Sequence, residues 1–174
     1  ITAGGENVAI GRQAMQDAAF GEGANVAIGY GAMMDINEGA HASAGADYNI
    51  AIGYHALKGA AFAGNPVEVD GNIAIGAFAL DATADNSHTG TIAIGHQSLS
   101  SLTSGNYNVA IGYQTLYNTV THQYNVAIGY TTLRDCVGNA NTGVGYASLR
   151  SNAAGQYNTA LGLESLYSNS STSN

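Results

Sequence analysis

The sequence contains little of what a compact enzyme usually carries. Charged residues make up 9% of the 174-residue chain, whereas about a quarter is usual in soluble domains. Cys136 is the only cysteine, so no disulfide can form within the chain and the fold must be held by burial and backbone hydrogen bonds. A buried thiol is the simpler role for Cys136, and a bridge between copies of the chain is the alternative. This composition favours a repetitive extracellular scaffold over an ordinary cytosolic enzyme.

Basic residues are also scarce. The formal net charge is -8, and the only bases are Arg12, Lys58, Arg134 and Arg150. Phosphate binding needs clustered Lys and Arg, so this balance argues against nucleic acid as a partner. Residues 1–90 contain ten acids and two bases, whereas residues 91–174 contain two of each. No run of eighteen apolar residues occurs, so we expect no direct membrane insertion. The chain opens within a repeat at Ile1, which suggests a piece of a longer fibre.

What the sequence has in abundance is a short repeat. A five-residue pattern can be aligned nine times with few exceptions. It reads Asn, then Val, Ile or Thr, then Ala, then Ile or Leu, then Gly, and Met or Leu follows four residues after each glycine. The underlying unit is about seventeen residues, because the later glycines are 16 to 19 residues apart. The nine glycines are Gly11, Gly29, Gly53, Gly76, Gly95, Gly112, Gly129, Gly145 and Gly162. Such a period predicts a solenoid, in which stacked coils share a thin core.

The period predicts one continuous repeat domain with two parts. Residues 1–90 carry insertions at 34–48, 58–71 and 81–90, whereas residues 91–167 keep the regular period. Residues 168–174 form a polar tail with no apolar side chain to bury. Insertions in a repeat array emerge as loops on one face. They are therefore the first place to look for a specific function.

Each unit is predicted to contain one short strand. Val109 and Ile111 alternate with Ala110, and a period of two is typical of a strand. We expect nine such strands to stack into a parallel sheet with the branched residues inside the coil. The alanine face would then leave room for a second or third chain, or for a loop of the same coil. The expected fold is all-β, a β-solenoid or β-helix of nine coils packed as a homotrimer, with a helical turn or a second strand after the glycine.

Three other repeat positions have structural interpretations. Asn precedes the strand in eight of nine units, with Thr91 as the exception, and stacked amides are expected to hydrogen-bond along the coils. A functional polar array is the alternative. The Leu or Met position is never polar and is expected to fill the core. All eleven tyrosines fall after the glycine, before the Asn or after the Leu. This regularity favours packing, while an exposed row would suit a glycan.

The insertions supply the candidate ligand-binding residues. These are Asp35, Glu38, His41 and Tyr48 in the first insertion, Tyr54 after it, and Glu68 and Asp70 in the second. Glu68 and Asp70 would lie on one face of an extended segment, which suits a calcium ion or an acid/base pair. Solvated loop acids are the simpler interpretation.

No motif for catalysis, a metal or a cofactor is present. The five histidines lie in different units, and no His-x-His or Cys-x-x-Cys pair occurs. The sequence also lacks a calcium-loop pattern, Gly-x-Ser-x-Gly and a phosphate-binding glycine loop. We therefore expect neither an enzyme nor a cofactor. A glycan-degrading enzyme of the tailspike type is the remaining catalytic alternative, because Glu68 and Asp70 offer a carboxylate pair.

The strings NVAIGYGAM, NIAIGYHAL, NVAIGYQTLY and NTALGLESLY resemble the Asn-Thr-Ala-Ile-Gly-Tyr-x-Ala-Leu repeats of phage tail-fibre and related bacterial fibre proteins. They are also similar to the shorter Ser-Val-Ala-Ile-Gly repeats of trimeric autotransporter adhesin heads. The resemblance spans Asn7 to Leu166. It implies a homotrimeric β-helical fibre segment, exposed on a virion tail or a bacterial cell surface, that binds a glycan or protein of a host or target cell.

The expected function is therefore adhesion or receptor binding, in which three identical weak sites on a rigid stalk gain avidity. An inert spacer is the main alternative, and it would bind no ligand. An ice-binding solenoid is a further alternative.

Overall fold

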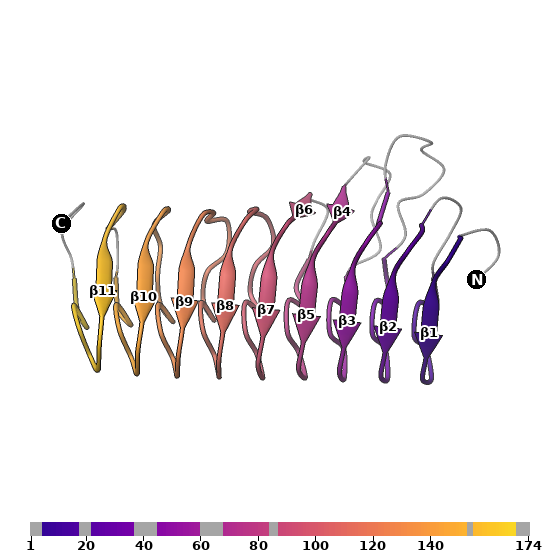
Figure 1. Cartoon of the computed structure of the whole chain (residues 1–174), viewed down its shortest axis with the longest axis horizontal. Coiled ribbons are helices and arrows are strands. Elements are labelled where there is room, and N and C mark those ends of the chain that lie inside the picture. The colour runs from indigo at the N-terminus through magenta and orange to yellow at the C-terminus, as the bar shows by residue number, and fades with distance from the viewer. Residues whose placement is uncertain are drawn as a thin grey trace.

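The protein is a parallel β-solenoid. The computed structural model describes residues 5–17, 22–36, 45–59, 68–83, 87–152 and 155–169, and these contain short strands and turns but no helix. Nine strands, one from each repeat, form a single parallel sheet (Figure 1). The all-β solenoid predicted by the period is confirmed, and homotrimeric packing stays a prediction. The strands are β1 (Val8–Ile10), β2 (Val26–Ile28), β3 (Ile50–Ile52), β5 (Ile73–Ile75), β7 (Ile92–Ile94), β8 (Val109–Ile111), β9 (Val126–Ile128), β10 (Thr142–Val144) and β11 (Thr159–Leu161).

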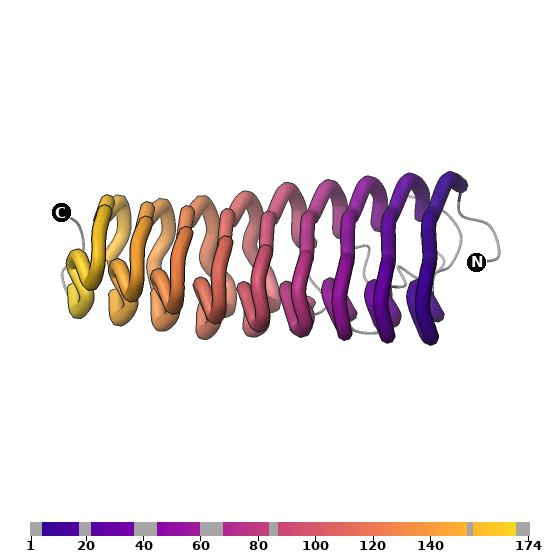
Figure 2. Tube along the Cα trace, turned by 60° about the horizontal axis from the view of Figure 1, so that its bottom comes forward, coloured from indigo at the N-terminus to yellow at the C-terminus, as the bar shows by residue number. Residues whose placement is uncertain are grey.

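The coils stack in register along one axis, as the tube in Figure 2 shows. Strands follow one another in the sheet in their chain order. Between β8 and β9, for example, Ala110 pairs with Ala127 and Ile111 pairs with Ile128. Because the register is kept, each repeat position forms its own row along the solenoid.

The prediction that the branched residues face the interior is wrong. Ala110 and its equivalents from Ala27 to Ala160 are buried, and Ala9 in the first coil is the exception, whereas the Val and Ile residues on either side are half-buried or exposed. The interior of each coil is thin, and the Leu or Met side chain from the opposite wall already fills it. Because protein interiors are close-packed, only a methyl group fits on the sheet side. The alanines therefore line the core and the branched side chains point outward.

The Leu or Met position fills the core as predicted. Leu116 is fully buried, and so are its equivalents from Met15 to Leu149 to within a few per cent, whereas Leu166 in the last described coil is 40% exposed. The segment after the glycine is a turn, so neither a helical turn nor a second strand forms there. It includes left-handed residues such as Leu116, with φ 51°. The Leu116 N–H donates to the Thr132 carbonyl of the next coil at 3.2 Å, so the turns are also linked from coil to coil.

The repeat glycine is required by a close approach between coils. Gly112 has φ 133°, where L side chains are strained. A Cβ at Gly112 would lie 1.7 Å from the carbonyl oxygen of Gly129. Only a residue without a side chain can therefore stack on the next glycine.

The asparagines form the predicted amide ladder inside the coils. Asn125 donates its N–H to Asn108 Oδ1 at 3.0 Å and its side-chain amide to the Gly138 carbonyl at 3.0 Å. Its own Oδ1 accepts the N–H of Asn141 at 2.9 Å. These amides are fully buried, so the structural interpretation is confirmed. At the exception, the buried Thr91 Oγ1 has no partner among the described residues.

The second and third insertions contribute a small extra sheet that the sequence did not predict. β4 (Val69–Asp70) pairs in parallel with β6 (His88–Thr89), and the pair extends one edge of the solenoid beside β5 and β7 (Figure 1). His88 is fully buried. Its Nε2 lies 3.0 Å from the Thr103 carbonyl oxygen, and burial lowers its pKa to about 4. The ring is therefore neutral at physiological pH.

Candidate functional site

An apolar strip covers the outer face of the main sheet. The sheet strip, as we call it, consists of two rows, one at the first strand residue and one at the third. At the coil spacing of about 4.8 Å, nine strands give it a length of roughly 40 Å. The first row is Val8, Val26, Ile50, Ile73, Ile92, Val109, Val126, Thr142 and Thr159, and the second is Ile10, Ile28, Ile52, Ile75, Ile94, Ile111, Ile128, Val144 and Leu161.

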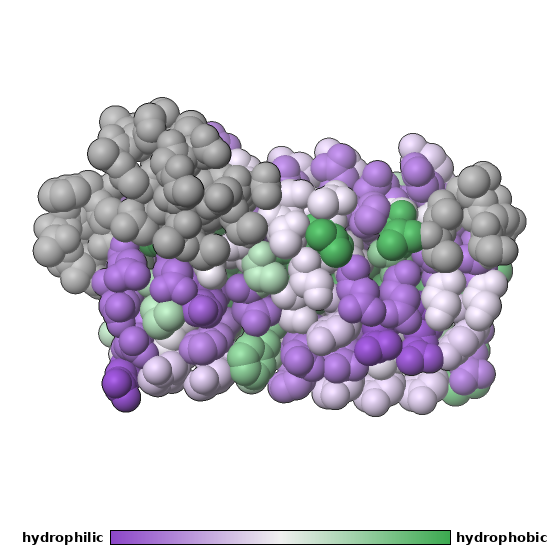
Figure 3. Space-filling model, turned by 180° about the vertical axis from the view of Figure 1, so that it is seen from behind, coloured by the Kyte–Doolittle hydropathy of each residue, from purple (hydrophilic) through white to green (hydrophobic). Residues whose placement is uncertain are grey.

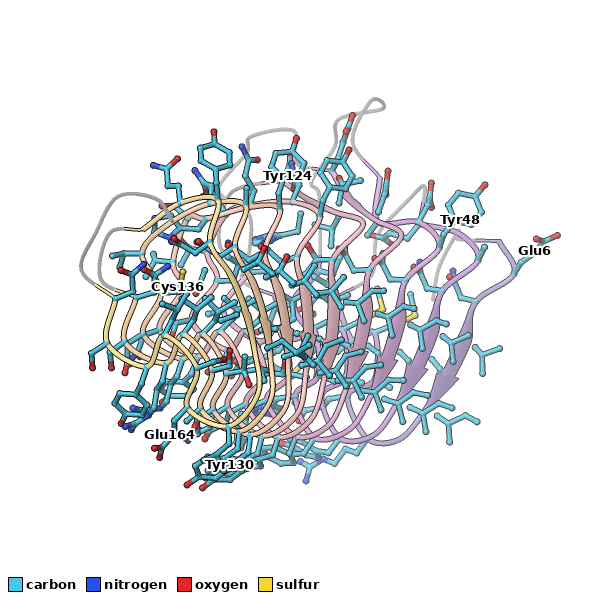
Figure 4. The ribbon with its side chains drawn as sticks, turned by 60° about the vertical axis from the view of Figure 1, so that its left-hand side comes forward. Glu6, Tyr48, Tyr124, Tyr130, Cys136 and Glu164 are labelled. Atoms are coloured by element: carbon cyan, nitrogen blue, oxygen red, sulfur yellow. The ribbon has the colours of Figure 1, made fainter. Side chains whose placement is uncertain are left out.

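The strip is open to solvent and lies on one side of the molecule. Ile10 is 58% exposed and Ile128 is 37% exposed, while most other members are half-buried by their neighbours in the row. Figure 4 shows the branched side chains standing off the strands. Seen from behind, the described residues present a mainly polar surface with small, separate apolar patches (Figure 3). A long contiguous apolar surface of this kind marks an interaction site.

A row of stacked aromatic rings follows the corner after the strands. We call this the tyrosine row. The rings of Tyr113 and Tyr130 are 5.2 Å apart, and those of Tyr130 and Tyr146 are 5.3 Å apart. Phe78 and His96 continue the contacts toward Tyr54 and Tyr30. The rings thus pack between coils as predicted. The tyrosines of the row also keep 37–50% of their surface exposed.

The tyrosines that precede the Asn lie at the opposite corner. Figure 4 places Tyr48 and Tyr124 there, away from Tyr130. Tyr107 and Tyr124 stack at 5.5 Å, while Tyr48 is 71% exposed. All of these tyrosines have φ close to 60°, a left-handed conformation that turns the ring outward at the corner.

Two predicted site residues, Asp35 and Tyr54, lie on the side of the tyrosine row. The Asp35 carboxylate is 3.4 Å from Lys58 Nζ. The ring of His55 stacks on Tyr54 with centroids 4.1 Å apart. Burial lowers the pKa of His55, and the Lys58 charge lowers it further, while Asp35 opposes both effects. Asp35 and Lys58 thus form an ion pair beside stacked rings.

Tyr48, Glu68 and Asp70 belong to the opposite corner, and Asp70 has a structural role there. Asp70 Oδ1 accepts the N–H of Asp47 at 2.9 Å, and Asp47 Oδ1 accepts the N–H of Gly23 at 2.6 Å. Burial raises the pKa of Asp70, the Asp47 N–H lowers it, and the charges of Asp47 and Glu68 raise it. The structure therefore separates the predicted residues into two groups. Glu38 and His41 lie outside the described residues.

Among the described residues, no group of three His, Cys, Asp or Glu side chains is placed to hold a metal ion. That part of the chain also contains no helix long and apolar enough to cross a membrane. Cys136 is fully buried, and its Sγ lies 3.6 Å from the Gly138 carbonyl. Burial raises the pKa of this thiol, which agrees with a buried thiol rather than a bridge between chains.

Sequence reasoning missed a groove beside the tyrosine row. A hollow of about 330 Å³ lies between Tyr130 and Tyr146 on one side and Arg134 and Arg150 on the other, with Glu164 at one end. The charges themselves could have drawn attention to this region, because residues 91–174 contain only four Arg, Asp and Glu side chains.

Comparison with known proteins identifies no relative: no protein-family model matches the chain, and neither a curated protein nor a solved structure matches it. The functional argument therefore depends on the arrangement of the chain's own residues.

Proposed function

We propose that this chain is a segment of a homotrimeric fibre on a virion tail or a bacterial cell surface, and that it attaches the fibre to glycans of a target cell. The observation that carries the proposal is the sheet strip. A flat apolar surface about 40 Å long is costly to leave in water, since burial contributes roughly 25 cal/mol per Å². Assembly of copies along this face removes it from solvent.

The repeat explains how such a contact would build up along a fibre. Each coil adds one residue to each row of the strip, so the buried area grows with every repeat. Three copies with parallel axes can turn their strips toward a common centre. The number three follows from the resemblance of the repeats to trimeric fibre proteins, and cyclic symmetry gives every copy the same environment.

Attachment is supported by the aromatic corners, which lie outside the strip. Tyr48, Tyr54, Tyr113, Tyr130 and Tyr146 are 41–71% exposed, and aromatic faces suit the apolar faces of sugars. In a trimer each corner site would occur three times on a rigid stalk, so weak individual binding would gain avidity.

The test of assembly is the absolute mass of the purified chain, measured by light scattering after size exclusion. We expect a stable trimer. Replacing Ile75 and Ile94 by Ser, in the middle of the strip, should dissociate it into folded monomers. The matched control replaces Val120 and Val137 by Ser. These valines are 45% and 48% exposed but lie outside the strip, so this variant should stay trimeric. A folded wild-type monomer or dimer would contradict the proposal.

A glycan-array screen of the trimer tests attachment separately. The inert spacer is the competing function, and it predicts a trimer that binds no glycan. Binding to a restricted set of glycans would support attachment, while an empty array would leave assembly as the only role.

A further inference from the structure

The charged residues of the second half of the chain gather at one place. Residues 91–174 contain only Arg134, Asp135, Arg150 and Glu164 as Arg, Lys, Asp or Glu. Arg134, Arg150 and Glu164 line the groove described above, and Asp135 lies 3.6 Å from Arg134. In a repeat array, the positions that depart from the period are the best candidates for a specific site. The convergence of four scattered charges is such a departure.

Three repeat positions build the groove. The first residue after the glycine forms one wall, with Tyr130 and Tyr146. The fifth residue forms the other wall, where Arg134 and Arg150 occupy successive coils. Backbone hydrogen bonds fix this second wall: the Asp135 N–H donates to the Arg150 carbonyl at 2.8 Å. The two arginines are therefore one coil, or about 4.8 Å, apart along the axis.

The groove is hollow because its floor is small. The second residue after the glycine lies between the two walls, and here it is Thr131 in one coil and Ala147 in the next. In the first half of the chain the same position holds His55 and Phe78, whose rings contact Tyr54 with centroids 4.1 and 5.2 Å away. The position differs from coil to coil rather than between the halves. It is Gln13, Gly31, His55 and Phe78 in the first half and Gln97, Gln114, Thr131, Ala147 and Glu164 in the second. The groove lies where two adjacent coils carry the small Thr131 and Ala147.

Both arginines are held in place by aromatic neighbours in the same wall. The guanidinium of Arg134 lies 5.3 Å from the Tyr117 ring and that of Arg150 lies 5.6 Å from the Tyr167 ring. Arg150 also donates a hydrogen bond to the Tyr167 hydroxyl. Arg134 Nε is buried and Arg134 Nη1 lies 3.6 Å from Asp135 Oδ1, so this guanidinium is also oriented by its neighbours.

This arrangement matches the chemistry of an acidic sugar. Guanidinium groups bind planar carboxylates through paired hydrogen bonds. Tyr130 is stacked between Tyr113 and Tyr146. Tyr146 stacks with Tyr130 alone among the described rings and is 50% exposed, so its other side suits the apolar face of a sugar ring. Glu164, which is exposed at the end of the groove, can accept hydrogen bonds from sugar hydroxyls. The cluster holds two positive and two negative charges, and Asp135 is already paired with Arg134. Arg150 and the remaining N–H donors of Arg134 therefore suit a single carboxylate rather than a polyanion.

We infer that the groove between Tyr130, Tyr146, Arg134 and Arg150 binds a carboxylate-bearing sugar of an acidic glycan. The inference rests on the proposed attachment function and names its ligand class and its site. Arg134 and Arg150 bind the carboxylate, Tyr146 packs on the sugar ring, and Glu164 accepts hydrogen bonds from the sugar hydroxyl groups. Sialic acids and uronic acids share this chemistry.

The experiment measures binding of two matched pairs of oligosaccharides to the full chain. One pair is sialyllactose and lactose, and the other is a glucuronate-containing tetrasaccharide and its carboxyl-reduced form. We expect at least one acid to bind at least tenfold more tightly than its neutral partner. The pair that shows the difference distinguishes a sialic acid from a uronic acid.

Two variants test the site, and one serves as a control. Replacing Arg134 and Arg150 by Gln should weaken binding of the acid at least tenfold. Ala147→Phe should do the same by filling the floor, as Phe78 does at φ 58° in its own coil. The control is Arg12→Gln, because Arg12 also lies over a tyrosine, 5.8 Å from the ring of Tyr30, but outside the groove. Arg12→Gln should bind like the wild type, and thermal unfolding should confirm that all variants are folded.

Results that contradict the proposed binding site in the groove differ from results that contradict the attachment function. Equal binding of acid and neutral partner, or full binding by folded Ala147→Phe, would overturn the groove while leaving attachment to glycans intact. Absence of binding by all four oligosaccharides would also overturn the groove, and an empty glycan array would then remove the attachment function too.

Discussion

The two halves of the solenoid share one interior but differ at their corners. In the first half two coils carry rings at the floor position, at His55 and Phe78, and two insertions add the strand pair β4 and β6. In the second half two coils carry the small Thr131 and Ala147 there, and the wall beside them carries two arginines. The main sheet continues in register through both. The corners can vary because the coil depends on the inward Ala, Leu, Asn and Gly positions alone.

The two halves can also be compared by the polar groups that they bury. The first half buries the neutral His88 and one oxygen of Asp81. The second half buries paired ladder amides, but also Thr91 Oγ1 and Arg134 Nε, which have no partner among the described residues. Replacing an unpartnered buried group can therefore stabilise the protein in either half, whereas replacing a paired ladder amide should destabilise it.

The largest effect is expected for Gly112→Ala in the regular half. A Cβ there would meet the Gly129 carbonyl oxygen at 1.7 Å at a φ of 133°, so two coils would have to separate. We expect a loss of more than about 4 kcal/mol in the free energy of unfolding. Chemical denaturation followed by far-ultraviolet circular dichroism measures this loss.

The matched control is Gly71→Ala in the decorated half. Gly71 has a φ of 64°, and a Cβ there would meet no atom within 4 Å. It should cost only about 1 kcal/mol, the penalty of a left-handed alanine. Equal losses in the two variants would show that backbone strain, rather than the approach of neighbouring coils, makes the repeat glycine necessary.

A smaller loss is expected when the amide ladder is interrupted. Asn125→Thr leaves the Asn141 N–H and the Gly138 carbonyl without their partner, and buried unpaired groups cost about 1–3 kcal/mol. We expect about 2 kcal/mol by denaturation. The control is Asn118→Thr at the surface, where the side-chain amide donates a hydrogen bond to Asp135, and its effect should stay within about 0.5 kcal/mol. An Asn125 variant as stable as the Asn118 variant would mean that the ladder contributes little.

Much of the coil could be predicted from the sequence, because a repeat reports the same physical requirement nine times. The glycine period, the Leu core and the Asn ladder could all be predicted because each of these repeat positions keeps a residue type that suits its buried place in the coil. The orientation of the sheet was predicted wrongly, because Ala110 and Ile111 are both apolar and hydrophobicity does not distinguish the two faces. Volume decides between them, since Leu from the opposite wall leaves room only for the methyl of Ala110.

The site was harder to predict for a different reason. The insertions supplied the candidate ligand-binding residues because they break the period. The candidates that the structure describes, such as Asp35 and Asp70, nevertheless lie at different corners. The groove arises from Arg134, Arg150 and the absence of a large side chain at Ala147. A missing side chain leaves no motif in one repeat. It becomes visible only when the filled coils at His55 and Phe78 are compared with the open ones.

The smallest effect, and the one with opposite sign, is expected at Asp81 in the decorated half. Its Oδ1 is buried without a partner among the described residues. Burial raises the pKa of this carboxyl to about 6, although its own backbone N–H and the charge of Lys58 lower it. The folded protein therefore takes up a proton between about pH 4 and pH 6 that the unfolded chain does not hold. The contribution of the protonated carboxyl to stability is present below pH 4 and is lost as pH rises through 6.

Asp81→Asn removes the charge and should remove this loss. We expect the variant to gain about 1 kcal/mol over the wild type at pH 8, because water still reaches part of the carboxylate and screens the effect. At pH 4 the difference should be close to zero. Urea denaturation at pH 4, 6 and 8 measures the gain, with Asp17→Asn as the control, since the Asp17 side chain is exposed. If Asp81→Asn gained the same amount at all three values, the gain would come from the shape of the side chain, and the buried charge would not distinguish the decorated half from the regular one.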